Sequence, residues 1–491
     1  MNDAHDLNLI LDSRIPIVVL ETHEEKRALQ LLTRVAVKRA CSLHCWSVTE
    51  GINHLGFGQK IGGKQDLCDP EQALIQIKQQ PQSAIIALCD FHPYLTNPTV
   101  VRLLKDIALN AETSGQTLLL ISHALKLPPE LSRLSAYFKL SLPSEQQLEA
   151  MIREEARAWA QDNGGHKVKT DQQTLQQLLS NLKGLSFDDS RRLIRAAIRD
   201  DGAIDDSDLP EINRGKFQLM DMEGILSFEY NTEKFSSVGG LHGLKDWLEH
   251  RKSAFLDTAP AQDCPKGVML LGVQGGGKSL AAKAIAGVWG LPLLRLDFAA
   301  LYNKYIGETE KNLREALQLS ELMSPCVLWI DEIEKGLANG QSDDGTSRRI
   351  QGTLLTWLSE RSKPVFVVCT SNDISGLPPE LVRKGRLDEI FFVDLPDAAI
   401  RQDIFAIHLR KRGQEPQTFD LARLAMSSEG FSGAEIEQAV VSGLYTAAAR
   451  AQALSTELVL DALEKTRPLS VVMGEKIQAL RHWAAERTVA A

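Results

Sequence analysis

The sequence predicts an α/β protein in which mostly parallel strands form sheets flanked by helices, arranged as two similar modules. Short apolar runs alternate with segments of helical apolar spacing along much of the chain, as they do in βαβ units. A glycine-rich segment directly follows one of these runs, at 272–279. The pentapeptide Leu-Pro-Pro-Glu-Leu occurs at 127–131 and again at 377–381, and an internal repeat indicates a duplicated unit.

The first module contains strand-like runs at 15–20, 84–89 and 117–121, each rich in aliphatic residues. The segments 24–40 and 100–111 carry the apolar spacing of helices. Strands that alternate with helices favour a parallel sheet, because parallel neighbours need a crossover connection.

The repeat extends past the pentapeptide. In each copy an apolar stretch that ends in Leu-Pro follows, at 137–143 and at 390–396. Further along, the helical pattern at 178–198 parallels the one at 424–444. We therefore predict two copies of one unit, each an α/β part with a helical lid.

Only the second copy carries residues for phosphate chemistry. The first copy has Glu-Thr-His-Glu-Glu-Lys at 21–26, where three carboxylates would repel phosphate. Asp90 follows an apolar strand, and Phe91 stands where we expect a catalytic carboxylate. His23 begins like a zinc-protease helix, but Arg27 replaces the second histidine. We interpret that histidine pattern as carrying no chemistry and the first copy as inactive.

The composition bounds the partners and the compartment. The chain has 491 residues, 43% of them hydrophobic, and a formal net charge of −9, which argues against nucleic acid as the main partner. No apolar run approaches the roughly 18 residues that a membrane span needs. The N-terminus has no basic leader, and seven scattered cysteines fit reduced thiols. We expect a cytoplasmic protein without a membrane span.

The glycine-rich segment predicts a nucleotide phosphate site. It follows the apolar run 268–271 and precedes a helix-like segment, the context that a G-x-x-x-x-G-K-S loop needs. Glycines let consecutive backbone N–H groups face a phosphate, and the helix N-terminus adds its positive end. Lys278 is expected to reach the β/γ-phosphates and Ser279 to bind Mg²⁺. The predicted ATP-contacting residues here are Gly272, Val273, Gln274, Gly275, Gly276, Gly277, Lys278, Ser279 and Leu280.

Two further strand ends supply polar groups for hydrolysis. The apolar strand 325–330 ends in Asp331 and Glu332, which we expect to hold hydrated Mg²⁺ and to polarise the attacking water, respectively. Asn372 follows the next buried strand and is expected to hold the water or the γ-phosphate.

These motifs resemble those of the AAA ATPases over roughly 231–468. The resemblance implies that Val238 and Gly239 contact adenine, and that Arg383 and Arg386 act on the nucleotide of the neighbouring subunit. Lys-Tyr-Ile at 304–306 is similar to the pore-loop pattern of the family. There Lys304, Tyr305 and Ile306 would grip a threaded polypeptide, although Tyr305 is also compatible with a packed core.

The predicted domains follow from this resemblance. They are a degenerate AAA-like α/β module without a P-loop at 1–200 and a linker or bridging helix at 201–230. An AAA α/β ATPase domain is expected at 231–396 and a C-terminal helical lid at 397–491.

The form of the P-loop is similar to that of one particular family within the AAA ATPases. With an inactive first copy, the loop is similar to that of the hypothetical chloroplast reading frame forty-six family of AAA proteins, in plastids and bacteria. The implied function is Mg-ATP hydrolysis by a homo-oligomer, a hexamer, that remodels or unfolds a protein substrate. Two alternatives stay open: an ATP-gated assembly switch that threads nothing, and a nucleic-acid-associated AAA protein, which the acidic balance disfavours.

Overall fold

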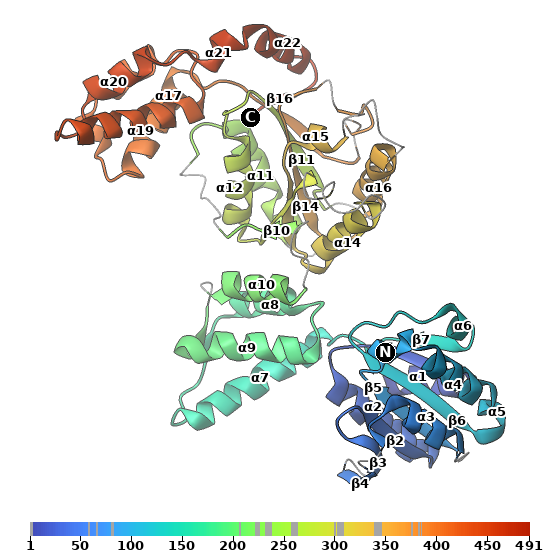
Figure 1. Cartoon of the computed structure of the whole chain (residues 1–491). Helices are drawn as coiled ribbons and strands as arrows, with labels where there is room; N and C mark the ends of the chain where they lie inside the picture. Colours follow the sequence, from blue (N-terminus) through green and yellow to red (C-terminus); the bar gives the residue numbers. More distant parts are fainter. Residues whose placement is uncertain are drawn as a thin grey trace. The chain divides into compact units, whose positions relative to one another are not determined.

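The computed structural model describes residues 3–56, 59–64, 67–79, 83–205, 208–220, 226–230, 238–256, 264–298, 301, 309–337, 346–374, 377–381, 383 and 385–491. The chain forms two compact units. One comprises Met1–Ser144 with Leu185–Asp188, and the other comprises Glu145–Gly184 with Asp189–Ala491. Figure 1 labels helices and strands of both units.

The first unit is built on a seven-stranded sheet with the order β4-β3-β2-β5-β6-β1-β7. The strands from β2 to β7 in this order pair in parallel, whereas β3 and β4 form antiparallel pairs at one edge. Its elements are α1 (Asp3–Asp12), β1 (Ile17–Glu21), α2 (Glu25–Arg39), β2 (Ser42–Ser47), β3 (Gly51–Gly56), β4 (Gln59–Lys64), α3 (Pro70–Gln79), β5 (Ala84–Cys89), η2 (His92–Thr96), α4 (Pro98–Leu109), α5 (Ala111–Ser114), β6 (Gln116–Ser122), α6 (Pro129–Ser132) and β7 (Ser135–Phe138).

The second unit begins with a mainly helical segment. It comprises α7 (Glu145–Asp162), β8 (Lys169–Thr170), α8 (Gln172–Leu182), α9 (Phe187–Asp201), β9 (Ala203–Ile204) and α10 (Asp208–Leu219), of which α9 begins in the first unit. The division into two compact units thus falls at other residues than the predicted domain boundaries at 200 and 230. Those boundaries stay a proposal. In particular, 201–230 contains a strand of the second sheet, β10 (Leu226–Phe228), besides α10.

The second sheet also has seven strands, in the order β10-β12-β13-β14-β11-β15-β16. All of its pairs are parallel except the edge pair of β10 with β12. The elements after β10 are α11 (His242–Leu256), β11 (Gly267–Gly272), α12 (Lys278–Trp289), β12 (Leu293–Leu296), α14 (Thr309–Leu322), β13 (Cys326–Ile330), α15 (Ile333–Leu337), α16 (Thr346–Glu360), β14 (Val365–Ser371) and β15 (Glu389–Val393).

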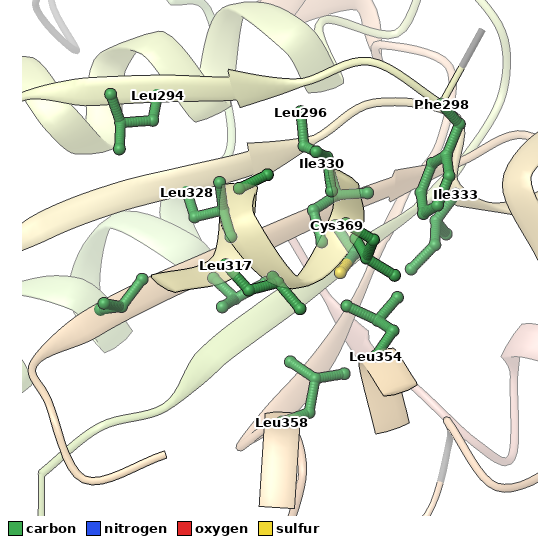
Figure 2. Packing of buried hydrophobic residues seen from close by; sticks show 14 of the residues in the cluster. Leu294, Leu296, Phe298, Leu317, Leu328, Ile330, Ile333, Leu354, Leu358 and Cys369 are labelled. Carbon is green, nitrogen blue, oxygen red and sulfur yellow. The ribbon is translucent and has the colours of Figure 1, made fainter. Parts of the chain in front are cut away.

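This sheet is buried on both faces, as parallel sheets usually are. Residues that alternate along β13 point to opposite faces: Leu328 and Ile330 pack with helices α14 and α16, whereas Trp329 packs with α12. Figure 2 shows the first of these two cores, in which Leu354 of α16 approaches Cys369 of β14. The apolar runs of the sequence are thus long because both sides of each strand are covered.

A helical lid follows the sheet. It consists of α17 (Ala398–Arg410), η4 (Pro416–Thr418), α18 (Leu421–Ser427), α19 (Gly433–Ala449), α20 (Thr456–Glu464), α21 (Leu469–Val472) and α22 (Gly474–Ala484). Figure 1 labels α17, α19, α20, α21 and α22 of this set. The predicted lid differs in one respect, because the chain returns to the sheet as β16 (Val489–Ala490). No helix among the described residues is both long and apolar enough to span a membrane.

The two sheets share one topology, which confirms the predicted α/β class and the duplicated module. Five strands follow the same chain order in both, β2-β5-β6-β1-β7 and β12-β13-β14-β11-β15. The pairing of β5 with β6 begins at Ala84 and Gln116, and the equivalent pairing of β13 with β14 begins at Cys326 and Val365. This register corrects one interpretation of the sequence: Asp90, six residues after Ala84, is equivalent to Glu332, six residues after Cys326. Both have a left-handed backbone, whereas Phe91 corresponds to buried Ile333.

Candidate functional site

The predicted phosphate loop joins β11 to α12 in the way that its sequence requires. Gly275 and Gly277 have left-handed φ angles of 76° and 94°, which glycine adopts without strain. Lys278 begins the helix, and its Nζ donates to the carbonyl oxygens of Gly272 at 2.9 Å and Val273 at 2.8 Å. Burial lowers the pKa of Lys278 to about 8, although nearby carboxylates oppose that shift. The buried Lys278 amine can therefore exchange its hydrogen bonds to backbone oxygens for hydrogen bonds to phosphate oxygens.

The predicted carboxylates lie at the carboxyl ends of β13 and β14. Thr370 Oγ1 donates to Asp331 Oδ1 at 2.6 Å and accepts the Glu332 backbone N–H at 3.0 Å. Asn372 Nδ2 donates to Glu332 Oε1 at 3.3 Å, and its backbone N–H donates to Glu334 Oε1 at 3.0 Å. The structure thus brings together Asp331, Glu332 and Asn372 as the sequence predicts, and it adds Thr370 and Glu334.

An arginine on β12 completes the surroundings of Asp331. Arg295 forms an ion pair of 3.1 Å with Asp331 Oδ2 and lies over the Trp329 ring, 4.8 Å from its centroid. On its other side Glu229 lies 3.9 Å from Arg295 and 2.9 Å from Lys283 Nζ. Sequence reasoning missed this chain of charges because Glu229 fell in the predicted linker; no motif marks it.

The phosphate loop and the carboxyl ends of β13 and β14 face one cavity of about 390 Å³. Of the predicted residues, Val238, Gly239, Asp331, Glu332, Asn372 and all residues from 274 to 280 line it. Gly272 and Val273 instead contribute the carbonyls that accept the lysine. The sequence did not single out the lid residues Ile404, Ile407, His408 and Glu437, which also line the cavity.

The lid is attached directly to the phosphate loop. The backbone N–H of Ala434, in the first turn of α19, donates to the Gly275 carbonyl oxygen at 3.2 Å. The side chain of Ser432 caps the same helix by accepting the Glu435 N–H. On the lid side of the cavity, burial lowers the pKa of His408, whose Nδ1 lies 3.5 Å from Glu437 Oε1. A ligand in the cavity therefore contacts the sheet and the lid together.

The predicted trans-acting arginines lie elsewhere. Arg383 is exposed, and Arg386 is held by its own chain, where it donates to the Glu380 carbonyl oxygen and, at 3.3 Å, to Ser359 Oγ. Neither is among the described residues that line the cavity. Lys304, Tyr305 and Ile306 lie outside the described residues. The roles of all of these residues stay predictions.

The residues fit a nucleotide with its ion. A Cβ at Gly275 would come within 2.8 Å of Ser432 Oγ, so that the loop is shaped around a bare backbone. The exposed Ser279 hydroxyl and the partly buried Asp331 supply the oxygen ligands that Mg²⁺ prefers. Among the described residues the Lys278 amine donates to two backbone carbonyl oxygens and to no carboxylate, so that its positive charge is available to a phosphate.

Comparison with known proteins places this site in a family. The AAA model, described as the ATPase family associated with various cellular activities, matches residues 268–395. Models of the N-terminal and second domains of SpoVK-like AAA ATPases match residues 3–140 and 146–223. The AAA domain-containing protein ycf46 of Pyropia yezoensis is 35% identical over 99% of this chain and 98% of its own length. The chain belongs to the ycf46 group of AAA proteins.

A second ycf46 protein matches the chain to the same extent. The ycf46 protein of Guillardia theta is 36% identical over 99% of this chain and 95% of its own length. A relative over a shorter stretch, the proteasome-activating nucleotidase of Aeropyrum pernix, is 37% identical over 42% of this chain and 52% of its own length. The ycf46 relatives thus match both units, whereas the nucleotidase matches less than half of the chain.

Proposed function

We propose that this chain hydrolyses ATP, with Mg²⁺, at the cavity between the phosphate loop, the strand ends and the lid. One observation carries the proposal: Lys278, Asp331 and the hydrogen-bonded pair of Glu332 and Asn372 line the same 390 Å³ cavity. A positive charge, an ion ligand and a water-activating carboxylate are the parts that phosphoryl transfer to water needs.

Each residue has a role that follows from its position. Bound Mg-ATP supplies the γ-phosphoryl group and a divalent charge that neutralises its oxygens. The loop glycines offer backbone N–H groups, and Ser279 and Asp331 hold the ion. Glu332 takes the proton of a water, and Asn372 keeps that carboxylate oriented. The Thr370 hydroxyl contacts both acidic residues, through the Asp331 carboxylate and the Glu332 backbone N–H.

We further propose that the site is completed by a second copy of this chain. Arg383 and Arg386 do not line the cavity of their own chain among its described residues, and this supports a trans role on a neighbour. A guanidinium is always charged and binds phosphate oxygens in pairs, so that it stabilises charge in the transition state. The assembly in this proposal is a hexameric ring.

We propose that the protein uses ATP hydrolysis to remodel a protein substrate in the cytoplasm, and that Tyr305 contacts this substrate in the pore. The relationship to a proteasome-activating nucleotidase supports this class of substrate. The net charge of −9 disfavours a nucleic-acid partner.

The decisive experiment mixes two inactive variants. Glu332→Gln and Arg386→Ala should each lower the ATPase rate by about 10²-fold or more at concentrations at which native mass spectrometry shows rings. Rings formed from a mixture of the two should regain activity, because some interfaces then combine an intact Glu332 with an intact Arg386. A wild-type rate that is complete in the monomer would disprove the trans site.

A second measurement separates a motor from an assembly switch. Tyr305→Ala should keep the ATPase rate but abolish the unfolding of a tagged protein substrate. If the variant still remodels like the wild type, the threading part of the proposal fails while ATP hydrolysis stands. If the wild-type ring binds ATP and does not turn over, the assembly switch replaces the motor.

A further inference from the structure

A cluster of metal-ligating side chains lies in the first unit, which lacks the phosphate loop. Asp90 follows β5, His92 begins η2, and His123 follows β6. One ligand atom from each lies within 4.8 Å of the other two. His92 is half-buried and the other two residues are exposed, so that an ion has access from solvent.

The two imidazoles are held by contacts that leave ring nitrogens for an ion. Ser122 is 2% exposed, and its Oγ lies 2.7 Å from His92 Nδ1, so that Nε2 faces away from that hydrogen bond. The rings of His92 and His123 meet edge to face, with centroids 4.7 Å apart. The ring of His23 stacks on that of His123, with centroids 5.7 Å apart. A hydrogen bond to one ring nitrogen is the usual support of a histidine ligand, because it fixes the ring orientation.

The backbone that carries these side chains is also anchored. Asp90 has a φ of 50°, a left-handed conformation that is uncommon for a residue with a side chain, and its N–H donates to the Ile121 carbonyl oxygen at 2.8 Å. Beyond His123, the Leu125 N–H donates to Glu21 Oε1 at 3.0 Å. The loop ends that bear the ligands are therefore tied to β6 and β1.

The place of the cluster matches that of the nucleotide site in the other unit. Asp90 stands at the register position of Glu332, as the strand pairing of the two sheets requires. His123 directly follows the last residue of β6, as Asn372 follows the last residue of β14. The carboxyl ends of parallel strands are where ligands bind in α/β folds. The first unit therefore keeps a polar strand-end site whose side chains suit a different ligand.

We propose that Asp90, His92 and His123 bind one divalent transition-metal ion. Two imidazoles with one carboxylate suit Zn²⁺ or Fe²⁺, whereas Mg²⁺ and Ca²⁺ prefer oxygen ligands alone. In the tetrahedral geometry of Zn²⁺, bonds of about 2.1 Å place two ligand atoms about 3.4 Å apart. The ligand atoms lie within 4.8 Å of one another, so they move closer by up to about 1.4 Å when the ion binds, through rotation of side chains of which two are exposed. Water or a further donor completes the coordination.

The test is equilibrium dialysis of the full-length, untagged chain against Zn²⁺, with Mg²⁺ in excess to cover the nucleotide site. We expect one equivalent of Zn²⁺ per chain that is lost in His92→Gln and in His123→Asn. The exposed His5 on α1 provides the matched control, because His5→Gln removes an imidazole from the same unit without touching the cluster. Ser122→Ala should weaken the binding by about 10-fold, as loss of an outer hydrogen bond does.

A spectroscopic readout distinguishes a specific site from scattered binding. Co²⁺ in place of Zn²⁺ should give ligand-field bands in the wild type and in His5→Gln that disappear in His123→Asn. Circular dichroism of each variant checks that the unit is folded. Equal retention of the ion by all variants would identify an adventitious ion only and overturn the proposal, as would a wild type that binds no ion at 100 µM.

Discussion

Thr370 and Ile121 stand at the same register position of the two sheets, five residues after the equivalent starts of β14 and β6. Thr370 Oγ1 joins Asp331 Oδ1 to the backbone N–H of Glu332, at 2.6 Å and 3.0 Å. Ile121 has no hydroxyl, and its backbone carbonyl oxygen accepts the Asp90 N–H instead. The Thr370 hydroxyl thus ties the Asp331 carboxylate to the Glu332 backbone, a link that Ile121 does not provide at the other strand end.

Thr370→Val is therefore expected to lower the ATPase rate while the chain still binds nucleotide. The change keeps the shape of the side chain but removes both hydrogen bonds, so that Asp331 and Glu332 lose a common support. We expect a 10–100-fold loss of kcat, as for other outer-contact residues of metal sites, and about 1–3 kcal/mol less stability from the stranded N–H. Steady-state kinetics and fluorescent-nucleotide titration measure the two effects.

The control is Thr418→Val, which removes a hydroxyl that donates to Glu415 on the exposed surface of the lid. It should leave kcat unchanged. Nucleotide binding lost together with kcat in Thr370→Val would show that the hydroxyl supports the whole cavity and not the carboxylates.

Nucleotide binding should take up a proton above pH 8. Burial places the pKa of Lys278 at about 8 in the free protein, and phosphate oxygens would raise it in the complex. At pH 7 the lysine is already charged, whereas at pH 9 it is mostly neutral until the nucleotide binds. The affinity should therefore fall as pH rises above about 8, at most tenfold per pH unit.

Calorimetric titration with ADP at pH 8.5, in buffers of different ionisation enthalpy, measures this uptake. Lys278→Arg supplies the comparison, since a guanidinium keeps its charge at this pH and should bind without proton uptake. Equal uptake by both proteins would assign the proton to another group.

A buried lysine outside the site should make stability rise with pH. Lys216 on α10 is 1% exposed and donates from Nζ to the Lys183 carbonyl oxygen at 2.6 Å. Burial lowers its pKa from 10.5 to about 8. Between those two values the unfolded chain binds more protons than the folded one, so that the free energy of unfolding increases with pH, by up to about 3 kcal/mol.

Urea unfolding at pH 7.5 and pH 10, compared between the wild type and Lys216→Met, isolates this contribution. Groups that do not interact with Lys216 cancel in the difference. The wild type should gain stability relative to the variant as pH rises; a constant difference would contradict the assigned burial of charge.

Gly275→Ala should weaken nucleotide binding more than it weakens the fold. The new Cβ would lie 2.8 Å from Ser432 Oγ, at a residue with a φ of 76° whose carbonyl oxygen accepts the lid N–H of Ala434. The left-handed conformation alone costs about 1–2 kcal/mol. Displacement of the lid adds a loss of affinity, which nucleotide titration measures.

Gly290→Ala is matched to this change. Gly290 ends α12 with a φ of 67°, and its added Cβ would meet nothing within 4 Å. It should lower the thermal midpoint to a similar extent and leave nucleotide affinity intact. Equal affinity losses in both variants would show that backbone strain, and not the lid contact, controls binding.

Much of the fold and of the site was predictable because its signals are local. The phosphate loop needs glycines at fixed spacing along the chain, so that the residues 272–279 alone indicate the site. Asp331 and Asn372 each end an apolar run, and parallel strands bring such ends to one edge. The duplicated module was predictable from Leu-Pro-Pro-Glu-Leu at 127–131 and 377–381.

What the sequence missed depends on register and on distant pairs. The sequence placed Phe91 one position off, at the position of Glu332 that Asp90 occupies, because the equivalence of β5 to β13 follows from strand pairing and not from spacing along the chain. Arg295 approaches Asp331 only because β12 pairs with β13. His123 belongs to no sequence motif, and only its position after β6 brings it close to Asp90 and His92.

The short strand β10 has a mechanical consequence. It is three residues long, lies at the edge of the sheet and pairs antiparallel with β12, the strand of Arg295. A strand of three residues forms few hydrogen bonds, so tension on the chain before it would detach β10 with less force than a longer strand needs. Glu229, the residue after β10, also holds this end through its ion pair with Lys283. Traction on the helical segment would thus reach β12, whose Arg295 is the ion-pair partner of Asp331.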